Sequence, residues 1–259
     1  MSDNIRNSDG VLLAARYAFM PNKLRYCGGD SNAELFEYAA QAVSDDGLKN
    51  MLREFETMFP YLRLIAEANK ILDPFDYKVV EAYWLGNELL ENVSMQNFYQ
   101  YLVDEQKLKK KLKPALVEKI FGKIPVGAKP HHSFHVLNIP KRTGHYPLEH
   151  TIKTMDECRI GWGKVKEQKS EIKDLNNLTK GIIIEYQPLA VAGDKLVLAE
   201  PIEREVWLEV NNKSFVAELK VGDFVSIHWG WVCDYLSQEQ KQNLEKWTKY
   251  NLNLANLYV

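Results

Sequence analysis

The stretch Cys158-Arg-Ile-Gly-Trp-Gly-Lys-Val165 places a cysteine directly ahead of a Gly-x-Gly turn and the start of a strand. A second stretch, Val221-Gly-Asp-Phe-Val-Ser-Ile-His-Trp-Gly-Trp-Val-Cys233, begins with a Gly-Asp turn and continues as an alternating strand that ends at His228. A thiolate and an imidazole at neighbouring strand ends suit a soft or borderline metal ion. We therefore predict that Cys158 and His228 form a metal-binding pair.

Short segments with a period of two follow Cys158 and are separated by Gly-Asp and Asn-Asn turns. They are Gly181–Tyr186, Lys195–Ala199, Glu203–Val210 and Asp223–His228. Strands of this length and spacing are typical of a small antiparallel β-barrel. Ser237 and Gln240 form a capping box, which predicts a C-terminal helix packed on the barrel.

The first 121 residues have apolar side chains at helical spacing and short connections, which predicts an all-α bundle. We expect its first helix, Val11–Phe19, to stop at Met20-Pro21, and Ser31 with Glu34 to form the capping box of the next. A further helix, Lys107–Phe121, has a lysine-rich outer face. The pattern changes between about residues 140 and 156. We therefore predict an α+β protein with a helical domain, 1–150, and a β-barrel domain, 151–259.

Composition excludes several classes of protein. The net charge of −2 and the pI near 6.3 argue against a nucleic-acid or membrane-surface binder, which usually carries a basic excess. The sequence contains no run of about 18 apolar residues, and its start lacks the apolar region of a signal peptide. The three cysteines lie far apart and do not suggest a disulfide framework. These features indicate a cytoplasmic protein.

The segment His131-His-Ser-Phe-His135 is a second candidate site, at the end of the helical domain. We expect His131–Ile139 to be extended, with His131 and His135 on one face; in a helix they would lie one turn apart. Either geometry presents two imidazoles to one metal ion, and His132 and Cys27 are further candidate ligands. The segment is otherwise a histidine-rich loop between the domains.

Each candidate residue also has an ordinary structural explanation. Cys158 can be a small buried apolar side chain, and His228 can be a core histidine bonded to a backbone carbonyl. Glu81, Trp84 and Asn87 share one helical face that mixes polar and aromatic groups. A helix that only packs in a core does not need that mixture, so we interpret this face as a candidate interface.

The two stretches around Cys158 and His228 resemble the hydrogenase-maturation chaperones of the HypC/HupF family over residues 158–259. That family has a cysteine, an apolar pair and Pro-Gly-Lys-Val, then Val-Gly-Asp-aromatic-Val-x-apolar-His-x-Gly and a Glu/Gln-rich helix. Trp162 stands at the proline position, and Cys158 is internal, whereas the family cysteine follows the initiator methionine. N-terminal motifs such as Pro21-Asn-x-Leu-x-Tyr-Cys27 look like those of an uncharacterised family that we associate with nickel–iron hydrogenase gene clusters.

The resemblance implies a nickel–iron hydrogenase maturation accessory protein, a metallochaperone rather than an enzyme. It would carry the iron unit Fe(CN)2(CO) through Cys158, assisted by His228. Its implied partners are the hydrogenase large-subunit precursor and the maturation scaffold protein. Two alternatives remain open. One is a metal-dependent enzyme with a His131, His132 and His135 site between the domains, and the other is a non-catalytic protein-interaction module.

Overall fold

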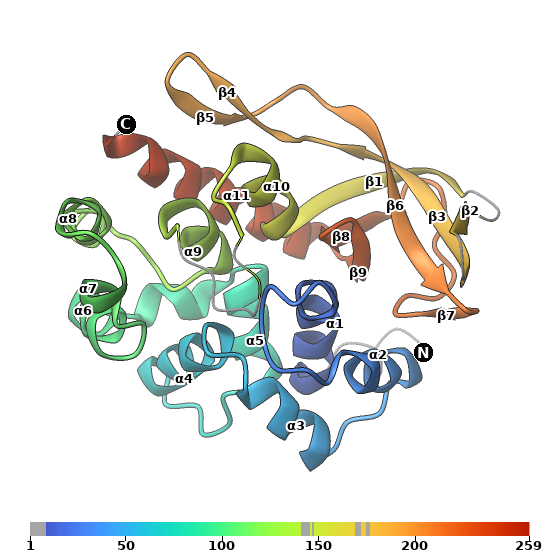
Figure 1. Cartoon of the computed structure of the whole chain (residues 1–259), viewed down its shortest axis with the longest axis horizontal. Helices are drawn as coiled ribbons and strands as arrows, with labels where there is room; N and C mark the ends of the chain where they lie inside the picture. Colours follow the sequence, from blue (N-terminus) through green and yellow to red (C-terminus); the bar gives the residue numbers. More distant parts are fainter. Residues whose placement is uncertain (1–8, 141–145, 147, 169–171, 175–176, 259) are drawn as a thin grey trace.

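The computed structural model describes residues 9–140, 146, 148–168, 172–174 and 177–258. Helices come first and a sheet-rich region follows, with a long helix near the C-terminus, which confirms the predicted α+β class (Figure 1). The helices are α1 (Gly10–Lys23), α2 (Asn32–Gln41), α3 (Asp46–Arg53), α4 (Met58–Ala68), α5 (Tyr77–Trp84), η1 (Glu88–Asn92), α6 (Met95–Asp104), α7 (Leu108–Lys111), α8 (Pro114–Phe121), α9 (His132–Asn138), α10 (Ile152–Cys158), α11 (Gln238–Ala255) and η2 (Asn256–Tyr258).

Seven strands pair in the order β2-β3-β1-β8-β9-β6-β7, and β4 and β5 form a separate antiparallel pair. β3 also pairs with β6, so the pairings among β3, β1, β8, β9 and β6 run in a ring. The strands are β1 (Gly161–Gln168), β2 (Ile172–Asp174), β3 (Asn177–Tyr186), β4 (Leu189–Ala192), β5 (Lys195–Leu198), β6 (Ile202–Val210), β7 (Lys213–Ser214), β8 (Phe224–His228) and β9 (Trp231–Leu236).

The largest buried core joins the helical part to the sheet-rich part. It includes Val80 of α5, Trp162 of β1, Trp231 of β9 and Trp247 of α11. Burying such side chains together is the main favourable term in folding. Apolar side chains from both sides of residue 150 share this core. The domain boundary near that residue stays a prediction.

Helix α1 runs through Pro21 to Lys23, so the prediction that it stops before the proline is wrong. Asp9 begins the helix, because its carboxylate accepts from the backbone N–H groups of Val11 and Leu12. A proline within a helix removes the N–H that would bond to the carbonyl four residues earlier, here that of Tyr17. The carbonyl of Tyr17 therefore needs a hydrogen-bond donor from outside the helix.

Two helix predictions in the first half are corrected. Ser31 precedes α2 but makes no capping hydrogen bond with its side chain, because its φ of −81° and ψ of 43° are not the extended conformation of a typical N-cap. The predicted helix Lys107–Phe121 is divided into α7 and α8. Pro114 begins α8, at a first-turn position where its missing N–H costs nothing.

Next to the candidate site, the structure selects the helical alternative for the histidine segment and contradicts the predicted Gly-x-Gly turn. Residues 132–138 form helix α9 rather than an extended segment, because Nδ1 of His131 accepts from the N–H of Ser133 and caps the helix. The Gly-x-Gly sequence lies inside strand β1 and is not a turn. A Cβ at Gly163 would come 2.5 Å from the Ile184 side chain of β3, so the glycine allows a close approach between paired strands.

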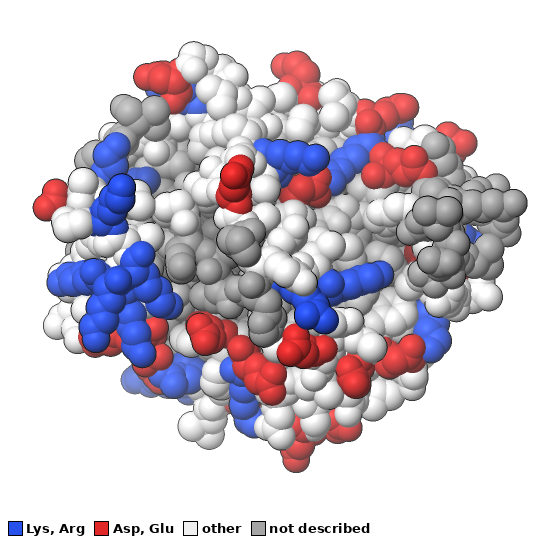
Figure 2. Space-filling view, in the orientation of Figure 1, with Lys and Arg blue, Asp and Glu red and all other residues white. Residues whose placement is uncertain are grey.

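No helix in the part of the chain that the structure describes is both long enough and apolar enough to cross a membrane. Figure 2 shows acidic and basic side chains interspersed over most of one face, with a cluster of basic side chains on the left, where α7 and α8 lie in Figure 1. Lys107, Lys109, Lys110, Lys111 and Lys113 are exposed in this segment.

Candidate metal centre

Three buried donor side chains from three separate elements meet at the junction of the helices and the sheet. They are His132 in the first turn of α9, Cys158 at the end of α10 and His228 at the end of β8. One ligand atom of each, an imidazole nitrogen or Sγ of Cys158, lies within 4.8 Å of the other two. All three line a cavity of about 30 Å³. We call His132, Cys158 and His228 the donor triad.

His228 is held in a defined tautomer. Its Nδ1–H donates to the carbonyl oxygen of Tyr17 at 2.7 Å, so Nε2 carries the lone pair. Nε2 is buried and has no hydrogen-bond partner among the described residues. Burial lowers the pKa of His228 to about 4, although the carbonyls of Tyr17 and Cys158 favour the protonated ring. The ring is therefore neutral near pH 7, which is the form that binds a metal ion.

The carbonyl that orients His228 is available because of Pro21. In an uninterrupted helix the carbonyl of Tyr17 would accept from the N–H of residue 21, but proline has none. Because of the proline, the Tyr17 carbonyl of α1 is available to accept a hydrogen bond from the imidazole of His228 on β8. Metal-binding histidines commonly donate their second N–H to a carbonyl or carboxylate in this way, which fixes the ring.

His132 is oriented by the same kind of contact. Its Nε2 lies 2.8 Å from the carbonyl oxygen of Cys158, so Nε2–H donates, and its Nδ1 accepts from the hydroxyl of Tyr83 at 3.1 Å. As the last residue of α10, Cys158 has a carbonyl beyond the hydrogen-bond ladder of its own helix. Burial and the neighbouring His228 lower the pKa of His132. Nδ1 is therefore the nitrogen that would bind a metal ion, in exchange for the Tyr83 hydrogen bond.

The donor triad combines members of both sites predicted from the sequence. Cys158 and His228 lie together, as the first candidate site requires, and His132 of the second site joins them. Cys27 and His135 line the same cavity but lie outside the triad. Nδ1 of His135 is 3.3 Å from the hydroxyl of Tyr61.

His131 occupies a different position from the other two histidines of its segment. Its ring stacks on Trp247 of α11 with the centroids 6.0 Å apart, and Nδ1 lies 2.7 Å from Oγ of Ser133. It is not among the described residues that line the cavity. Burial lowers the pKa of His131 to about 3. The segment therefore does not bring all three imidazoles to one point.

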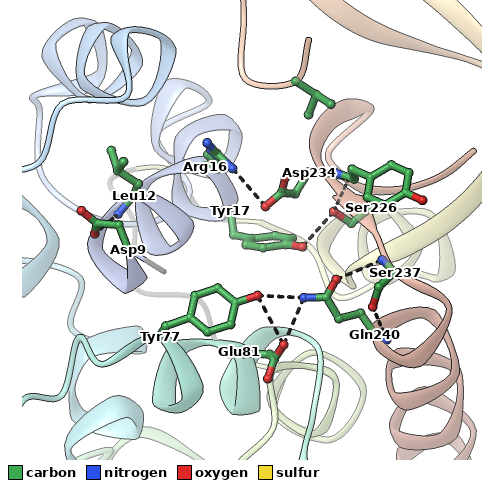
Figure 3. Close-up of polar contacts among 12 residues, drawn as sticks. Asp9, Leu12, Arg16, Tyr17, Tyr77, Glu81, Ser226, Asp234, Ser237 and Gln240 are labelled. Atoms are coloured by element: carbon green, nitrogen blue, oxygen red, sulfur yellow. Dashed lines mark hydrogen bonds and ion pairs between the residues drawn. The ribbon is translucent and has the colours of Figure 1, made fainter. Parts of the chain in front are cut away.

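The three candidate interface residues separate into two locations. Trp84 packs its ring on His132, with centroids 4.5 Å apart, and so forms part of the wall of the cavity. Glu81 instead accepts from Nε2 of Gln240 on α11 at 3.0 Å (Figure 3) and from Nδ2 of Asn87 at 2.9 Å. Glu81 and Asn87 thus lie where the helical part meets α11.

Figure 3 also shows how α1 is fixed to the sheet. The hydroxyl of Tyr17 is 2.8 Å from Oγ of Ser226 on β8, and Nη1 of Arg16 is 3.1 Å from the carboxylate of Asp234 on β9. Both contacts come from Tyr17 or the residue before it, and the Tyr17 carbonyl orients His228. Tyr17, Pro21 and Tyr83 were not predicted as site residues, because their roles depend on partners far away in the sequence.

A comparison with protein families identifies this chain as similar to one of them. The model of a family described as a family of unknown function (DUF6390) matches residues 6–259. No curated protein and no solved structure matches the chain.

Proposed function

We propose that this chain, which belongs to the DUF6390 family of unknown function, binds one transition-metal ion at the donor triad and delivers metal during nickel–iron hydrogenase assembly. The observation that carries the metal site is Nε2 of His228, a buried lone pair with no hydrogen-bond partner among the described residues. A buried acceptor left in this state is costly, and a bound cation would satisfy it.

The donor set suits a borderline or soft metal ion. One thiolate and two neutral imidazoles match the preferences of zinc, copper and iron, and both imidazoles are already oriented by backbone carbonyls. Structural zinc sites are closed by four protein ligands, whereas a three-ligand site keeps one position open. An open position suits a protein that receives and releases its metal.

The recipient is inferred from the resemblance to the HypC/HupF chaperones. The ring of pairings through β3, β1, β8, β9 and β6 is the connectivity that a small HypC-like barrel needs, and α11 follows it as the closing helix does in that family. In this proposal the protein is a cytoplasmic metallochaperone. Its partners are the hydrogenase large-subunit precursor and the maturation scaffold.

The cargo implied by the resemblance is Fe(CN)2(CO). The size of the cavity limits which species can bind there without a change in the protein. A volume of about 30 Å³ accommodates roughly one water-sized group. A bare ion fits such a space, but an iron atom with three diatomic ligands needs a wider one. The proposal therefore requires that the cavity opens when the complete unit binds through Cys158.

The decisive experiment is metal analysis of protein purified without oxygen from cells that express the hydrogenase maturation proteins. We expect about one metal ion per wild-type chain and its loss in Cys158→Ser and His228→Gln. Cys233→Ser is the matched control, because Cys233 is a buried cysteine outside the cavity. Absence of metal from the wild type would contradict metal binding.

Infrared spectroscopy of the same samples tests the cargo separately. Cyanide and carbon monoxide stretching bands in the wild type, absent in Cys158→Ser, would support Fe(CN)2(CO) as the bound species. Bound metal without these bands would restrict the proposal to a bare ion and remove the support for this cargo.

A further inference from the structure

We propose that Cys27 is the entry ligand of the donor triad, through which a metal ion passes between solvent and the buried site. The inference rests on the metal binding proposed above and adds the route that the ion takes. Cys27 lies in the loop between α1 and α2 and lines the same cavity as His132, Cys158 and His228.

The donors around the cavity differ in their exposure. Cys158, His228, His132 and His135 are 4%, 1%, 7% and 4% exposed, whereas Cys27 is only partly buried. An ion that arrives from water must lose its hydration shell, and this is easiest when protein ligands replace the water molecules one at a time. Cys27 is the cavity donor that such a hydrated ion meets first.

The cavity also contains an acceptor site for the ion. Nε2 of His228 is buried, has no hydrogen-bond partner among the described residues and belongs to a residue that lines this cavity. A partly buried cysteine and an unsatisfied buried nitrogen therefore border one small space. This combination provides both an entrance and a destination.

The loop holds Cys27 in place at the entrance. Nδ2 of the buried Asn22 donates to the carbonyl oxygens of Cys27 at 3.0 Å and Gly29 at 2.7 Å. Gly28 has a φ of +79°, and a Cβ there would come 2.5 Å from the ring of Phe55, so the loop lies directly against this ring. The same end of α1 contains Pro21, which leaves the Tyr17 carbonyl to His228.

Cys27 is not a fourth ligand of the triad in this structure, because it lies outside the group of donor atoms within 4.8 Å of one another. Entry is then a sequence of ligand exchanges without electron transfer. A hydrated divalent ion exchanges one water molecule for the Cys27 thiolate, and the thiol proton passes to solvent. The ion next exchanges three more water molecules for Nε2 of His228, Sγ of Cys158 and Nδ1 of His132, which gives up its hydrogen bond to Tyr83. The proton of the Cys158 thiol leaves with the released water. The bond to Cys27 breaks, and its thiolate takes up a proton.

Stopped-flow absorption with Co²⁺ as the probe tests this route, because a cobalt–thiolate bond absorbs in the near ultraviolet. An entry ligand accelerates association and dissociation equally. We expect Cys27→Ser and Cys27→Ala to slow both rates at least tenfold and to leave the equilibrium Kd within about threefold of the wild type. Cys233→Ala is the control with the same number of thiols, and its rates should match the wild type.

Each other outcome has a distinct meaning. Wild-type rates in both Cys27 variants would overturn the entry role but leave the metal site intact. Faster dissociation with a weaker Kd would make Cys27 a permanent ligand and also overturn it. No Co²⁺ binding by the wild type would overturn the proposed metal site and this inference together. Alkylation of Cys27 in the wild type provides a check without a substitution, since it should slow both rates in the same way.

Discussion

The carbonyl oxygen of Tyr17 accepts a hydrogen bond from Nδ1 of His228 at 2.7 Å, across 211 residues of sequence. The contact exists because Pro21 cannot donate to that carbonyl. A proline within the first helix therefore sets the tautomer of a candidate ligand at the end of β8. Pro21, where the sequence predicts the end of a helix, is part of the support of the site.

Substitution of Pro21 by alanine should weaken metal binding without weakening the fold. Alanine restores an N–H that competes with His228 for the Tyr17 carbonyl, and loss of such an orienting contact costs about tenfold or more in metal affinity. The free energy of unfolding of the metal-free protein should not fall, because alanine is far better than proline inside a helix.

Metal titration and denaturant unfolding measure the two effects. Pro114→Ala, at the first turn of α8, is the control, and an unchanged affinity in Pro21→Ala would contradict the role of the proline.

Removing the Tyr83 hydroxyl should strengthen metal binding. The hydroxyl donates to Nδ1 of His132 at 3.1 Å, the nitrogen that a metal ion would occupy, so it competes with the metal. Tyr83→Phe should tighten binding by about three- to tenfold, the value of one hydrogen bond of about 1 kcal/mol, and should destabilise the metal-free protein by a similar free energy. Calorimetric titration measures the first effect and denaturant unfolding the second.

Tyr61→Phe is the matched control for Tyr83→Phe. It removes a buried hydroxyl that contacts His135, a cavity residue outside the triad, at 3.3 Å. Its metal affinity should equal that of the wild type. Weaker binding in Tyr83→Phe would mean that His132 does not bind the metal through Nδ1.

Local patterns predicted the parts of this site that depend on neighbouring residues. The alternating strand that ends at His228 is β8, and Ser237 and Gln240 form the predicted capping box of α11. Both features depend on side-chain periodicity or on groups three residues apart, which one sequence displays directly.

Two features of the site could not be predicted because they depend on distant or unusual partners. His132 joins Cys158, 26 residues away, only because α9 and α10 pack together, and the helix around it depends on an uncommon cap, the imidazole of His131. The freed carbonyl of Tyr17 is visible in the sequence as a proline four residues later. Its hydrogen bond from Nδ1 of His228 on β8, however, follows from tertiary packing alone.

Breaking the mostly buried ion pair between α1 and β9 should destabilise the protein. Arg16 and Asp234 are 3.1 Å apart, and each side chain is 13% exposed. Asp234→Ala leaves the guanidinium poorly solvated and unpaired, so we expect a loss of about 2 to 4 kcal/mol in the free energy of unfolding. A double-mutant cycle with Arg16→Met should give a coupling of about 2 kcal/mol.

The exposed pair Arg63 and Glu105 provides the reference for that cycle. Its atoms are also 3.1 Å apart, but the side chains are 44% and 42% exposed. Its coupling should stay below about 1 kcal/mol because water screens the charges. Equal couplings in the two cycles would mean that burial does not strengthen the contact between α1 and β9.

The buried amine of Lys123 should make stability depend on alkaline pH. Its Nζ donates to Oδ1 of Asn138 at 2.7 Å, and burial, with a smaller effect of Lys119, lowers the pKa of Lys123 to about 8. Between about pH 8 and the ordinary lysine value of 10.5, the unfolded chain binds more protons at this site than the folded chain, so stability due to Lys123 rises with pH.

Relative to Lys123→Gln, which keeps a donor but does not titrate, the wild type should gain about 1 to 2 kcal/mol in the free energy of unfolding across this interval, because solvent screening reduces the full effect. Denaturant unfolding at a series of pH values measures the difference. Lys110→Gln on the exposed face of α7 should show no such change, and a wild-type curve parallel to that of Lys123→Gln would rule out the depressed pKa.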